Sequence, residues 1–456
     1  MRRLQRISIP AAVLAFSAAA WAGGEGELRV GIAVRDVTPE GPIWLNGYAA
    51  RKRPSERVDT PLLVQAVAFQ DAGGEKLVLV AVDNCEANRD FTAPVLEKIR
   101  ERFSLAPEAV ILVWSHTHSA PCLPGVLEEM FQFGEEERKR IDAYGERLSA
   151  ALVEVVGEAL GDLRPATLQA GKSRAGFGMN RRIFVEDRVQ FGENPEGPVD
   201  PEVPVLAIRG EKGELRAVLF GYACHGTSIH GEDFYVVSGD YIAYARQALE
   251  GAFPGTRAVF LTGFGADINP SPRGRLVHAR QHGLELAGAV AGVLNRPLRP
   301  VAGPLRRASA RLALPLAPPP SREKLQEDLK AKDVHVRSRA KRWLDRLEAG
   351  QALPTAVDCP LAAVRFGGDL TFLFLAGEVV VDYSLRLKRE LALEHPWTVG
   401  YAFEIPCYIP SARILKEGGY EADSSLVYYG LYGPLLGRSE KMIVDRFREL
   451  VGELKK

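Results

Sequence analysis

The hydrophobic positions along the chain follow two spacings that alternate from beginning to end. Short runs that are apolar throughout, or at every second position, predict β-strands, and apolar residues three or four positions apart predict amphipathic helices. The strand pattern occurs at residues 28–34, 62–70, 76–82, 109–114, 203–208, 215–222, 258–262, 363–366 and 370–375. The helical pattern occurs at residues 88–103, 136–160, 241–249, 276–294, 379–391 and 443–454.

This order of elements predicts an α/β fold, because strands and helices alternate along the chain. Some strands follow one another directly, as across Gly367 and Gly368, so we expect mixed β-sheets flanked by helices. Candidate site motifs are spread along the whole chain, which favours a single large domain over residues 23–456. A highly charged helical stretch at about residues 320–350 is expected to be an excursion from the core of that domain.

The first 22 residues differ from the rest of the chain. Arginines precede a short apolar run, and Ala20-Trp21-Ala22 offers the small residues that a signal peptidase reads. The run is shorter than the roughly 20 apolar residues that a membrane-spanning helix needs. We therefore expect a signal peptide at residues 1–22 and a secreted or periplasmic protein with no integral membrane segment after its removal. The alternative is an uncleaved anchor.

Composition narrows the class of protein. The 456 residues include 58 basic and 58 acidic side chains, and 46% are hydrophobic, which is ordinary for a globular protein. The balanced charge argues against nucleic acid as a partner, since proteins that bind it are usually basic. Five cysteines make an odd count, so the sequence does not imply a complete disulfide framework.

Histidines stand at the ends of two buried strands. His116 and His118 follow the strand at 109–114, and residues two apart point to the same side of an extended chain, so both rings can face one pocket. His225 follows the strand at 215–222 in the same way. Imidazole is a common ligand of zinc and similar metals, so the pattern indicates a metal or catalytic site. The alternative is that these rings only bind backbone carbonyls.

Two further strand ends carry candidate polar groups. Glu378 follows the strand at 370–375 and is either a carboxylate ligand or a charge at the start of a helix. Asn269 lies in a glycine-containing loop after the strand at 258–262, where the backbone can approach a ligand closely. His230 is a weaker candidate. We expect surface or packing roles for the remaining histidines, which are His278, His282, His335 and His395.

Taken in order, these motifs resemble the neutral/alkaline non-lysosomal ceramidase family, in its N-terminal catalytic domain. The resemblance runs from Gly31 to about Ser425. It rests on Asn46-Gly47-Tyr48-Ala49, His116-Thr117-His118-Ser119, Asn180-Arg181, Ser238-Gly239-Asp240-Tyr241, Gly377-Glu378 and Gly418-Gly419-Tyr420-Glu421. Each piece is short, and their order makes the set specific.

Members of that family bind zinc through two histidines, one glutamate and one tyrosine. The resemblance therefore implies a Zn²⁺ cofactor held by His116, His225, Glu378 and Tyr408. It implies that His118 faces the scissile carbonyl, and that Arg181, Tyr420 and protonated His118 stabilise the developing oxyanion. The implied activity is hydrolysis of the amide of an N-acyl lipid, such as an N-acylsphingosine, or of a related amide, through zinc-activated water.

Two departures from the family pattern bear on mechanism and substrate. Where family members carry the serine of an Asp-x-Ser-Pro motif, implicated as the nucleophile, this chain has Asn269. An amide is a poor nucleophile, so we expect Asn269 only to donate a hydrogen bond to the oxyanion. Family members also carry a C-terminal immunoglobulin-like domain, which does not follow the last motif in this sequence. Ceramide in a membrane is therefore a less expected substrate.

These departures leave other readings open. One alternative is a zinc-dependent esterase or lactonase on the same scaffold, and another is a catalytically inactive binding homologue.

Four cysteines lie near the motifs, either as a disulfide or thiol at the pocket or, as we prefer, as small buried residues packed around it: Cys85, Cys122, Cys224 and Cys407. The sequence does not indicate an oligomeric state.

Overall fold

The computed structural model describes residues 27–368 and 370–455, so the expected signal peptide at 1–22 lies outside the described residues. The strands are β1 (Arg29–Asp36), β2 (Arg57–Val58), β3 (Leu63–Gln70), β4 (Lys76–Val82), β5 (Val110–Trp114), β6 (Arg164–Arg174), β7 (Gly178–Val185), β8 (Arg188–Asn194), β9 (Glu202–Gly210), β10 (Leu215–Tyr222), β11 (Val236–Val237), β12 (Arg257–Thr262), β13 (Ile268–Pro270), β14 (Arg299–Val301), β15 (Leu305–Pro315), β16 (Ala356–Phe366), β17 (Leu370–Ala376), β18 (Glu378–Val379), β19 (His395–Ala402) and β20 (Tyr408–Ile409). The α-helices are α1 (Arg89–Phe103), α2 (Glu135–Gly161), α3 (Asp240–Ala252), α4 (Leu276–Leu294), α5 (Arg322–Asp328), α6 (Val334–Glu348), α7 (Val381–Glu390), α8 (Ala412–Glu417) and α9 (Arg438–Glu453).

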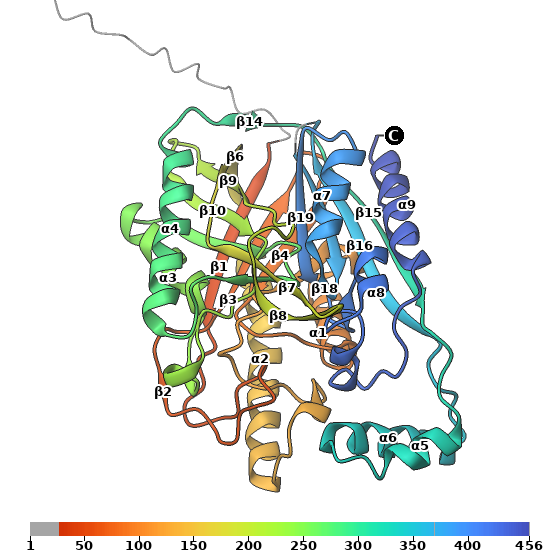
Figure 1. Cartoon of the computed structure of the whole chain (residues 1–456). Coiled ribbons are helices and arrows are strands. Elements are labelled where there is room, and N and C mark those ends of the chain that lie inside the picture. The colour runs from red at the N-terminus through yellow and green to blue at the C-terminus, as the bar shows by residue number, and fades with distance from the viewer. Residues whose placement is uncertain (1–26, 369, 456) are drawn as a thin grey trace, which may run out of the picture.

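A mixed sheet of 13 strands lies at the centre, with helices on its flanks (Figure 1). Its order is β12-β10-β9-β6-β1-β3-β4-β5-β19-β17-β16-β15, and β14 pairs with β6. Pairs β4–β5, β10–β12 and β17–β19 are parallel, whereas β1–β3, β3–β4 and β16–β17 are antiparallel. The α/β prediction with mixed strands is therefore confirmed.

The predicted strands and helices are present, and several further strands were missed. Most ends differ by a few residues, but β16 begins seven residues and α9 five residues before the predicted start. Strands β6, β7, β8, β15 and β19 have no counterpart in the prediction. Polar and charged side chains occupy the exposed positions of β6, β8 and β15, so their hydrophobic signal is weak. The charged stretch at about 320–350 forms two helices, α5 and α6. Asp333 stands before the first residue of α6, and its side chain caps that helix by accepting from the His335 amide.

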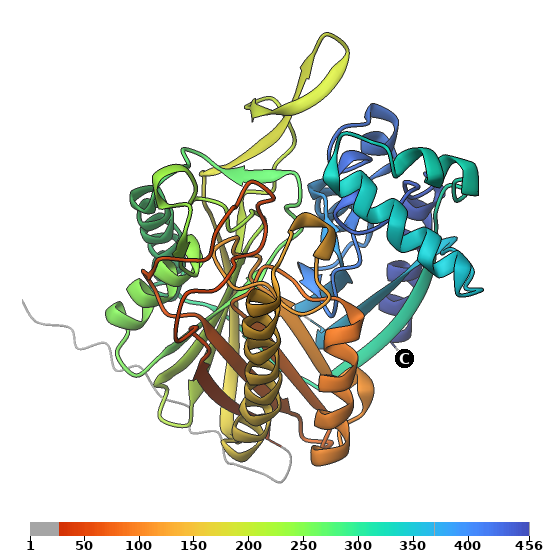
Figure 2. The same ribbon diagram turned by 90° about the horizontal axis from the view of Figure 1, so that it is seen from below.

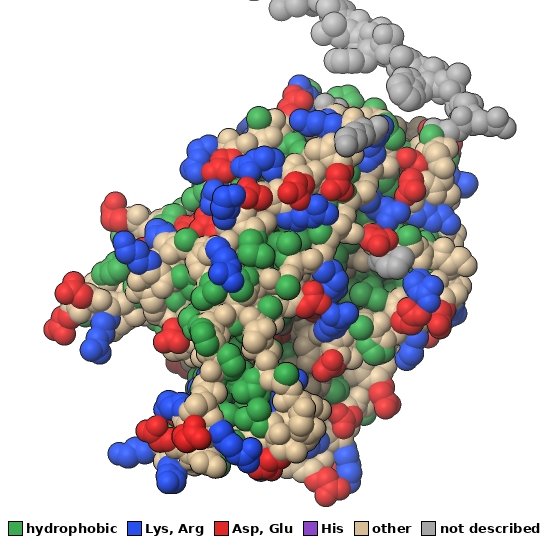
Figure 3. Space-filling model, turned by 90° about the vertical axis from the view of Figure 1, so that its right-hand side faces the viewer, with side chains coloured by type: hydrophobic (Ala, Val, Ile, Leu, Met, Phe, Trp, Pro, Cys, Tyr) green, Lys and Arg blue, Asp and Glu red, His purple; other side chains and the backbone are tan. Residues whose placement is uncertain are grey.

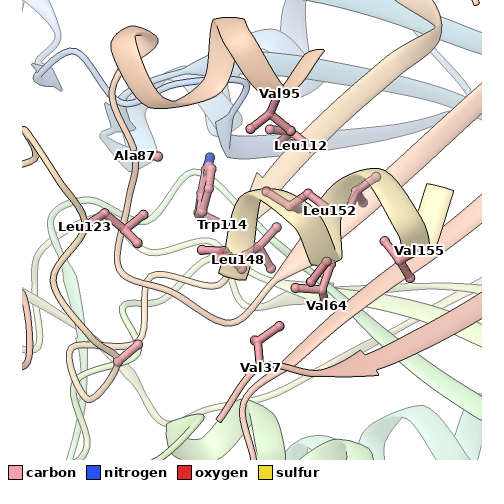
Figure 4. Packing of buried hydrophobic residues seen from close by; sticks show 14 of the residues in the cluster. Val37, Val64, Ala87, Val95, Leu112, Trp114, Leu123, Leu148, Leu152 and Val155 are labelled. Carbon is pink, nitrogen blue, oxygen red and sulfur yellow. The ribbon is translucent and has the colours of Figure 1, made fainter. Parts of the chain in front are cut away.

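The central strands are buried on both faces, which explains their nearly continuous apolar runs. On β3, β4 and β5, alternate residues belong to two different clusters. Val64, Leu112 and Trp114 pack against Leu148 and the rest of the apolar face of α2, as Figure 4 shows. The intervening residues face an inner cluster of aliphatic and aromatic side chains.

That inner cluster forms because the sheet curls, so that β12 at one end lies against the central strands. Gln65 Nε2 of β3 donates to the carbonyl oxygen of Ala258 (2.9 Å), and Thr262 Oγ1 of β12 donates to that of Trp114 (2.8 Å). Helices α3 and α4 then cover the outer face of β9, β10 and β12. Helices α7 and α9 cover β15, β16 and β17.

Two parts of the chain extend from this core. Helices α5 and α6 lie beside the sheet (Figure 1), and the β7–β8 hairpin projects at the top of Figure 2. On the side that carries α9, acidic and basic side chains are intermingled, as Figure 3 shows. Within the described residues, no helix combines the length and apolarity that crossing a membrane requires.

Candidate metal centre and cavity

Two strand ends meet because of the register of β19. Its last residue, Ala402, pairs with Val113 of β5 on one side and with Ala376 of β17 on the other. His116 follows β5 and Glu378 follows β17, so both side chains arrive at the same end of the sheet. The pairing in one strand therefore joins segments that are far apart in the sequence.

A glycine makes the turn into Glu378 possible. Gly377 has a φ of +90°, and a Cβ at this position would lie 2.8 Å from the carbonyl oxygen of Cys407. Any other residue would be strained there and would push the two segments apart. The Gly377-Glu378 motif is thus a backbone requirement as well as a source of a carboxylate.

Short pairings outside the large sheet bring in the remaining candidates. An isolated bridge between Thr117 and Gly226 sets the loop of His116 and His118 beside that of His225. Strands β18 and β20 pair with Glu378 opposite Tyr408. Strands β13 and β7 pair with Asn269 opposite Met179, which brings Asn269 to the segment that carries Arg181.

His116, His225 and Glu378 form a compact buried group. Nε2 of each histidine lies 3.1 Å from Oε2 of Glu378, and the three side chains are almost completely shielded from solvent. One ligand atom from each residue lies within 4.8 Å of the other two. Two ligands of a tetrahedral ion, each about 2.1 Å from it, lie roughly 3.4 Å apart, so this donor set fits a metal such as zinc.

The backbone fixes which nitrogen of each histidine is available. Nδ1 of His116 lies 2.8 Å from the carbonyl oxygen of Cys85, and Nδ1 of His225 lies 3.0 Å from that of Gly265. A carbonyl only accepts hydrogen bonds, so Nδ1 of each ring carries a proton, and a neutral ring then leaves its Nε2 lone pair for a metal ion beside Glu378. This tautomer is the one that a metal ligand needs.

The second oxygen of Glu378 is held by a tyrosine that the sequence analysis did not identify. Tyr429 Oη lies 2.6 Å from Glu378 Oε1 and 3.0 Å from Glu86 Oε2. Burial, and next the charge of Glu378, raise the pKa of Glu86 well above its usual range. Burial alone would raise the pKa of Glu378, but the two imidazoles outweigh it and hold that pKa low. Glu378 therefore carries the charge and Glu86 the proton.

His118 lies at the edge of the same group. Its Nε2 is 3.1 Å from His116 Nε2, and its ring centroid is 4.7 Å from that of Tyr48. Gly47 permits this approach, because a Cβ there would lie 2.4 Å from the imidazole. Burial, and then His116 and His225, lower the pKa of His118 well below 6.5, so the structure favours a neutral ring over the protonated form expected from the sequence.

Arg181 connects the group to its surroundings. Its Nη2 donates to Tyr408 Oη (3.1 Å), its Nε donates to Glu421 Oε1 (2.8 Å), and its Nη1 lies 3.3 Å from His225 Nε2. Glu421 also pairs with Arg182. Burial, and then Glu378, raise the pKa of Tyr408 well above 10, and Arg181 opposes this shift.

Asn269 is oriented by its oxygen. Its Oδ1 accepts from Thr227 Oγ1 (3.2 Å) and from Arg181 Nη1 (3.4 Å), which assigns Oδ1 to that side and leaves the amide nitrogen toward the cavity. The hydroxyl of Ser271 donates instead to Glu193 Oε1 (2.6 Å). Ser271 thus has a partner of its own, which lies on the β7–β8 hairpin and not in the group of His116, His225 and Glu378.

A cavity of about 450 Å³ opens beside this group. Its lining includes the candidate side chains His118, Arg181, Asn269, Tyr408 and Tyr420. The ring of Tyr420 lies 5.4 Å from that of Tyr408 and 4.9 Å from that of Phe191 on the β7–β8 hairpin. All eight candidate residues named from the sequence thus lie in one region of the molecule.

Residues predicted to lie outside the site do so. The ring of His282 stacks on Phe177, and Nδ1 of His335 lies 2.5 Å from the carbonyl oxygen of Glu129. All five cysteines are free and buried, as expected for packing residues. Burial, and then Glu86, raise the pKa of the Cys85 thiol well above 9, which favours the neutral thiol of a packing residue, although Cys85, His116 and His118 also lie close enough together to hold a metal.

The residues that the sequence analysis missed are mainly supports. Glu86 and Tyr429 belong to no motif, and only the fold shows that Tyr429 hydrogen-bonds to both Glu378 and Glu86. Glu421 stands inside the Gly418-Gly419-Tyr420-Glu421 motif, so its position was visible although its pairing with Arg181 was not. Its place in that motif was the signal in the sequence by which Glu421 could have been found.

Comparison with known proteins agrees with this geometry. The sequence profile of the family described as neutral/alkaline non-lysosomal ceramidase, N-terminal, matches residues 28–274, which is more than half of the chain. The neutral ceramidase of rice (Oryza sativa subsp. japonica) is 24% identical over 230 residues, which cover 48% of this chain. The match spans only 28% of the rice protein.

Two solved structures share the fold. The neutral ceramidase from Pseudomonas aeruginosa superimposes with a TM-score of 0.71 at 18% identity, covering 95% of this chain and 75% of that chain. A structure described as ceramidase complexed with C2 gives a TM-score of 0.70 at 17% identity, covering 94% and 75%. These superpositions confirm the α/β architecture.

Proposed function

Because the chain belongs to the neutral/alkaline non-lysosomal ceramidase family of hydrolases, we propose that it is a zinc-dependent amidohydrolase that cleaves the amide of an N-acyl lipid or a related amide. The observation that carries this proposal is the group of His116, His225 and Glu378. Both Nε2 atoms lie 3.1 Å from one carboxylate oxygen, and both Nδ1 atoms face backbone carbonyls. This donor set suits zinc.

His116, His225, Glu378 and Tyr408 would hold the ion. When bound, zinc would polarise the amide carbonyl and lower the pKa of a hydrolytic water toward about 7. Tyr408 is the ligand that the chemistry supports least directly, since a phenol is an unusual donor to zinc. Its position opposite Glu378 in the β18–β20 pair supports including it.

The other candidate residues would act on the developing oxyanion. Arg181 is held by Glu421 and keeps its guanidinium beside His225, where a negative charge would develop. Tyr420 lines the cavity with its phenol, and the neutral ring of His118 keeps one N–H to donate. The amide nitrogen of Asn269 would add a donor, which is the role left to it without a hydroxyl.

Ester or lactone hydrolysis is the second candidate. It is favoured by the absence of a hydroxyl at Asn269 and by the engagement of Ser271 with Glu193. An ester is easier to cleave than an amide, so a centre without a serine nucleophile suits that reaction.

Two measurements test the proposal together. Elemental analysis of the purified protein should find one zinc per chain, and hydrolysis should stop on chelation and return with zinc. A panel of N-acyl amides against esters of the same acyl groups should then show higher kcat/KM for an amide. Better turnover of every ester would establish the second candidate, and zinc binding without turnover of either class would indicate a binding homologue.

Residues 23–456 are proposed to act as one catalytic domain, exported after removal of residues 1–22. Sequencing the N-terminus of protein recovered outside the cytoplasm should find Gly23 first. An intact Met1 would instead favour an uncleaved anchor.

A further inference from the structure

The cavity contains a guanidinium that pairs with no carboxylate. Arg273 lies in the loop between β13 and α4 and is half-buried in the cavity lining. Within the part of the chain that the structure describes, no carboxylate is within ion-pair distance of it. By contrast, Arg181 pairs with Glu421, and Arg275 pairs with Glu232 (2.7 Å). The charge of the buried Asp240 acts on Arg273 without forming an ion pair. A guanidinium that faces a cavity and is paired with no carboxylate is available to an anion from outside.

Two contacts hold this guanidinium in place. Arg273 Nε donates to the carbonyl oxygen of Thr227 (3.0 Å), and its Nη2 donates to Tyr48 Oη (3.0 Å). A guanidinium has five N–H groups, so three remain after these contacts. Because the side chain is already ordered, an anion that binds it costs little additional side-chain entropy.

The same contacts connect Arg273 to the candidate metal centre. Tyr48, which accepts from Arg273, packs edge-on against His118 with ring centroids 4.7 Å apart. His118 in turn lies 3.1 Å from His116. Both ends of this chain of contacts border one cavity of about 450 Å³, a volume that accommodates a small ligand.

The rest of the lining suits an acyl chain. Met130, Met179 and Phe191 give the cavity an apolar surface beside its charged groups. Among the described residues that line the cavity, Glu193 is the one carboxylate; it is exposed, accepts from Ser271 and forms no ion pair with Arg273.

We propose that the substrate is an N-acyl compound whose amine part carries an anionic group, a carboxylate or a phosphate, and that Arg273 pairs with this group. The inference rests on the proposed amidohydrolase function and narrows its substrate class. Charge-assisted bidentate pairing with a fixed guanidinium would supply specificity that the apolar lining cannot.

The test compares three substrates that share an octanoyl chain and a two-carbon spacer: N-octanoyl-β-alanine, N-octanoyl-phosphoethanolamine and N-octanoylethanolamine. We expect kcat/KM to be roughly 10- to 100-fold higher for one or both anions than for the neutral alcohol, the size of a hydrogen bond to a charged group. Arg273→Gln should abolish that preference, measured as the ratio of kcat/KM for each anion to kcat/KM for the neutral alcohol, so that a general loss of rate cancels. The rates for the two anions distinguish carboxylate from phosphate.

Arg275→Gln is the matched control, because it removes the same charge from the same loop at a side chain that pairs with Glu232. It should keep the preference. Arg273→Lys retains the charge and should keep part of the preference. The loss in Arg273→Gln can then be assigned to the missing charge and not to a folding defect. A neutral substrate preferred by the unmodified protein, or a preference unaffected by Arg273→Gln, would overturn the inference.

Binding separates this inference from the proposed function. Equilibrium dialysis measures the affinity of the three compounds whether or not they are cleaved. If no amide is hydrolysed, the proposed function fails, but tighter binding of an anion that depends on Arg273 would still support the inference. Equal binding of all three compounds would refute it.

Discussion

The site has a buried floor and an open wall, and different parts of the fold build them. We define the floor as His116, His225, Glu378 and Tyr429, and the wall as Arg181, Phe191, Asn269, Arg273 and Tyr420. Every floor side chain is bonded to backbone or to another buried group. The wall depends partly on the β7–β8 hairpin, where Phe191 is 56% exposed.

This difference indicates a division of roles. The floor follows from the register of β5, β10, β17 and β19, whose strands are packed on both faces, and such a framework leaves little freedom to its side chains. It even holds His116 at a φ of +56°, a conformation that costs a non-glycine residue roughly 1–2 kcal/mol. The wall lines the cavity, and apart from the buried Arg181 its residues lie in loops or in the small sheet of β13, β7 and β8, where the chain can vary without disturbing the large sheet. We infer that the floor holds the metal, whereas the wall contacts the substrate and the charge that develops on it.

The largest expected effect comes from removing a floor ligand. His116→Ala should abolish stoichiometric zinc and reduce kcat/KM by more than the roughly 100-fold typical of losing an outer support of a metal site. His395→Ala is the control, since His395 lies at the far end of β19. Zinc content and hydrolysis are measured on both proteins, and full zinc in His116→Ala would disprove the ligand assignment.

A wall residue should affect rate without affecting metal. Asn269→Ala should lower kcat by roughly 100-fold, as loss of one oxyanion donor does, while zinc content stays unchanged. An unchanged kcat would make Asn269 structural. Asn269→Ser restores the residue of the family pattern, and a gain in ceramide hydrolysis would show that position 269 limits that reaction.

The support of Glu378 can be weakened by one hydroxyl. Tyr429→Phe should lower zinc affinity roughly 10- to 100-fold, because Glu378 Oε1 loses the partner that orients the carboxylate. Competition with a chromophoric chelator measures this affinity. Tyr432→Phe removes a hydroxyl that lies by Trp343, away from the floor, and should leave it unchanged. If the unmodified protein, Tyr429→Phe and Tyr432→Phe all bind zinc with the same affinity, the Tyr429 hydroxyl does not support Glu378 and the ring only packs.

The pH dependence of the free energy of unfolding tests Asp267, a buried carboxyl group near the site. Asp267 accepts from the Val381 amide (2.8 Å) and from Asn180 Nδ2 (3.1 Å), and burial raises its pKa from 3.8 to about 6. Its stabilising contribution is therefore complete below pH 3.8 and is lost as the pH rises through 6. The shift corresponds to about 3 kcal/mol at neutral pH.

Asp267→Asn should remove this dependence. Urea unfolding between pH 4 and 7.5 should show the unmodified protein losing stability relative to the variant by up to about 3 kcal/mol. The difference between the two curves isolates Asp267 from other titrating groups. Parallel curves would show that Asp267 ionises normally in the folded protein.

The smallest effect is expected at the rim of the wall. Phe191 lies 5.0 Å below the Arg181 guanidinium and packs on Tyr420. Phe191→Ala should raise KM about two- to fivefold, as for an exposed cation–π contact, with kcat and zinc content unchanged. A large loss of kcat would instead place Phe191 in the positioning of Arg181.

The sequence by itself determined the fold class and the candidate residues. The apolar periodicity of β3, β4, β5, β10, β12 and β17 was strong because those strands are buried, and the histidines and Glu378 were visible because they follow such strands directly. The resemblance to the ceramidase family, which rests on the order of short motifs, implied Arg181, Tyr408 and Tyr420. Strands such as β8 and β15 were missed because their exposed polar positions dilute the same signal.

Only the tertiary structure decided how these residues meet. Register in β19 and the Thr117–Gly226 bridge are long-range pairings, which local periodicity does not encode. The hydrogen bonds from Tyr429 to Glu378 and from Arg273 to Tyr48 are likewise properties of the packed chain. Local spacing predicts which face of a strand or helix a side chain occupies. Which residues it contacts there depends on strands that come together from the whole length of the protein.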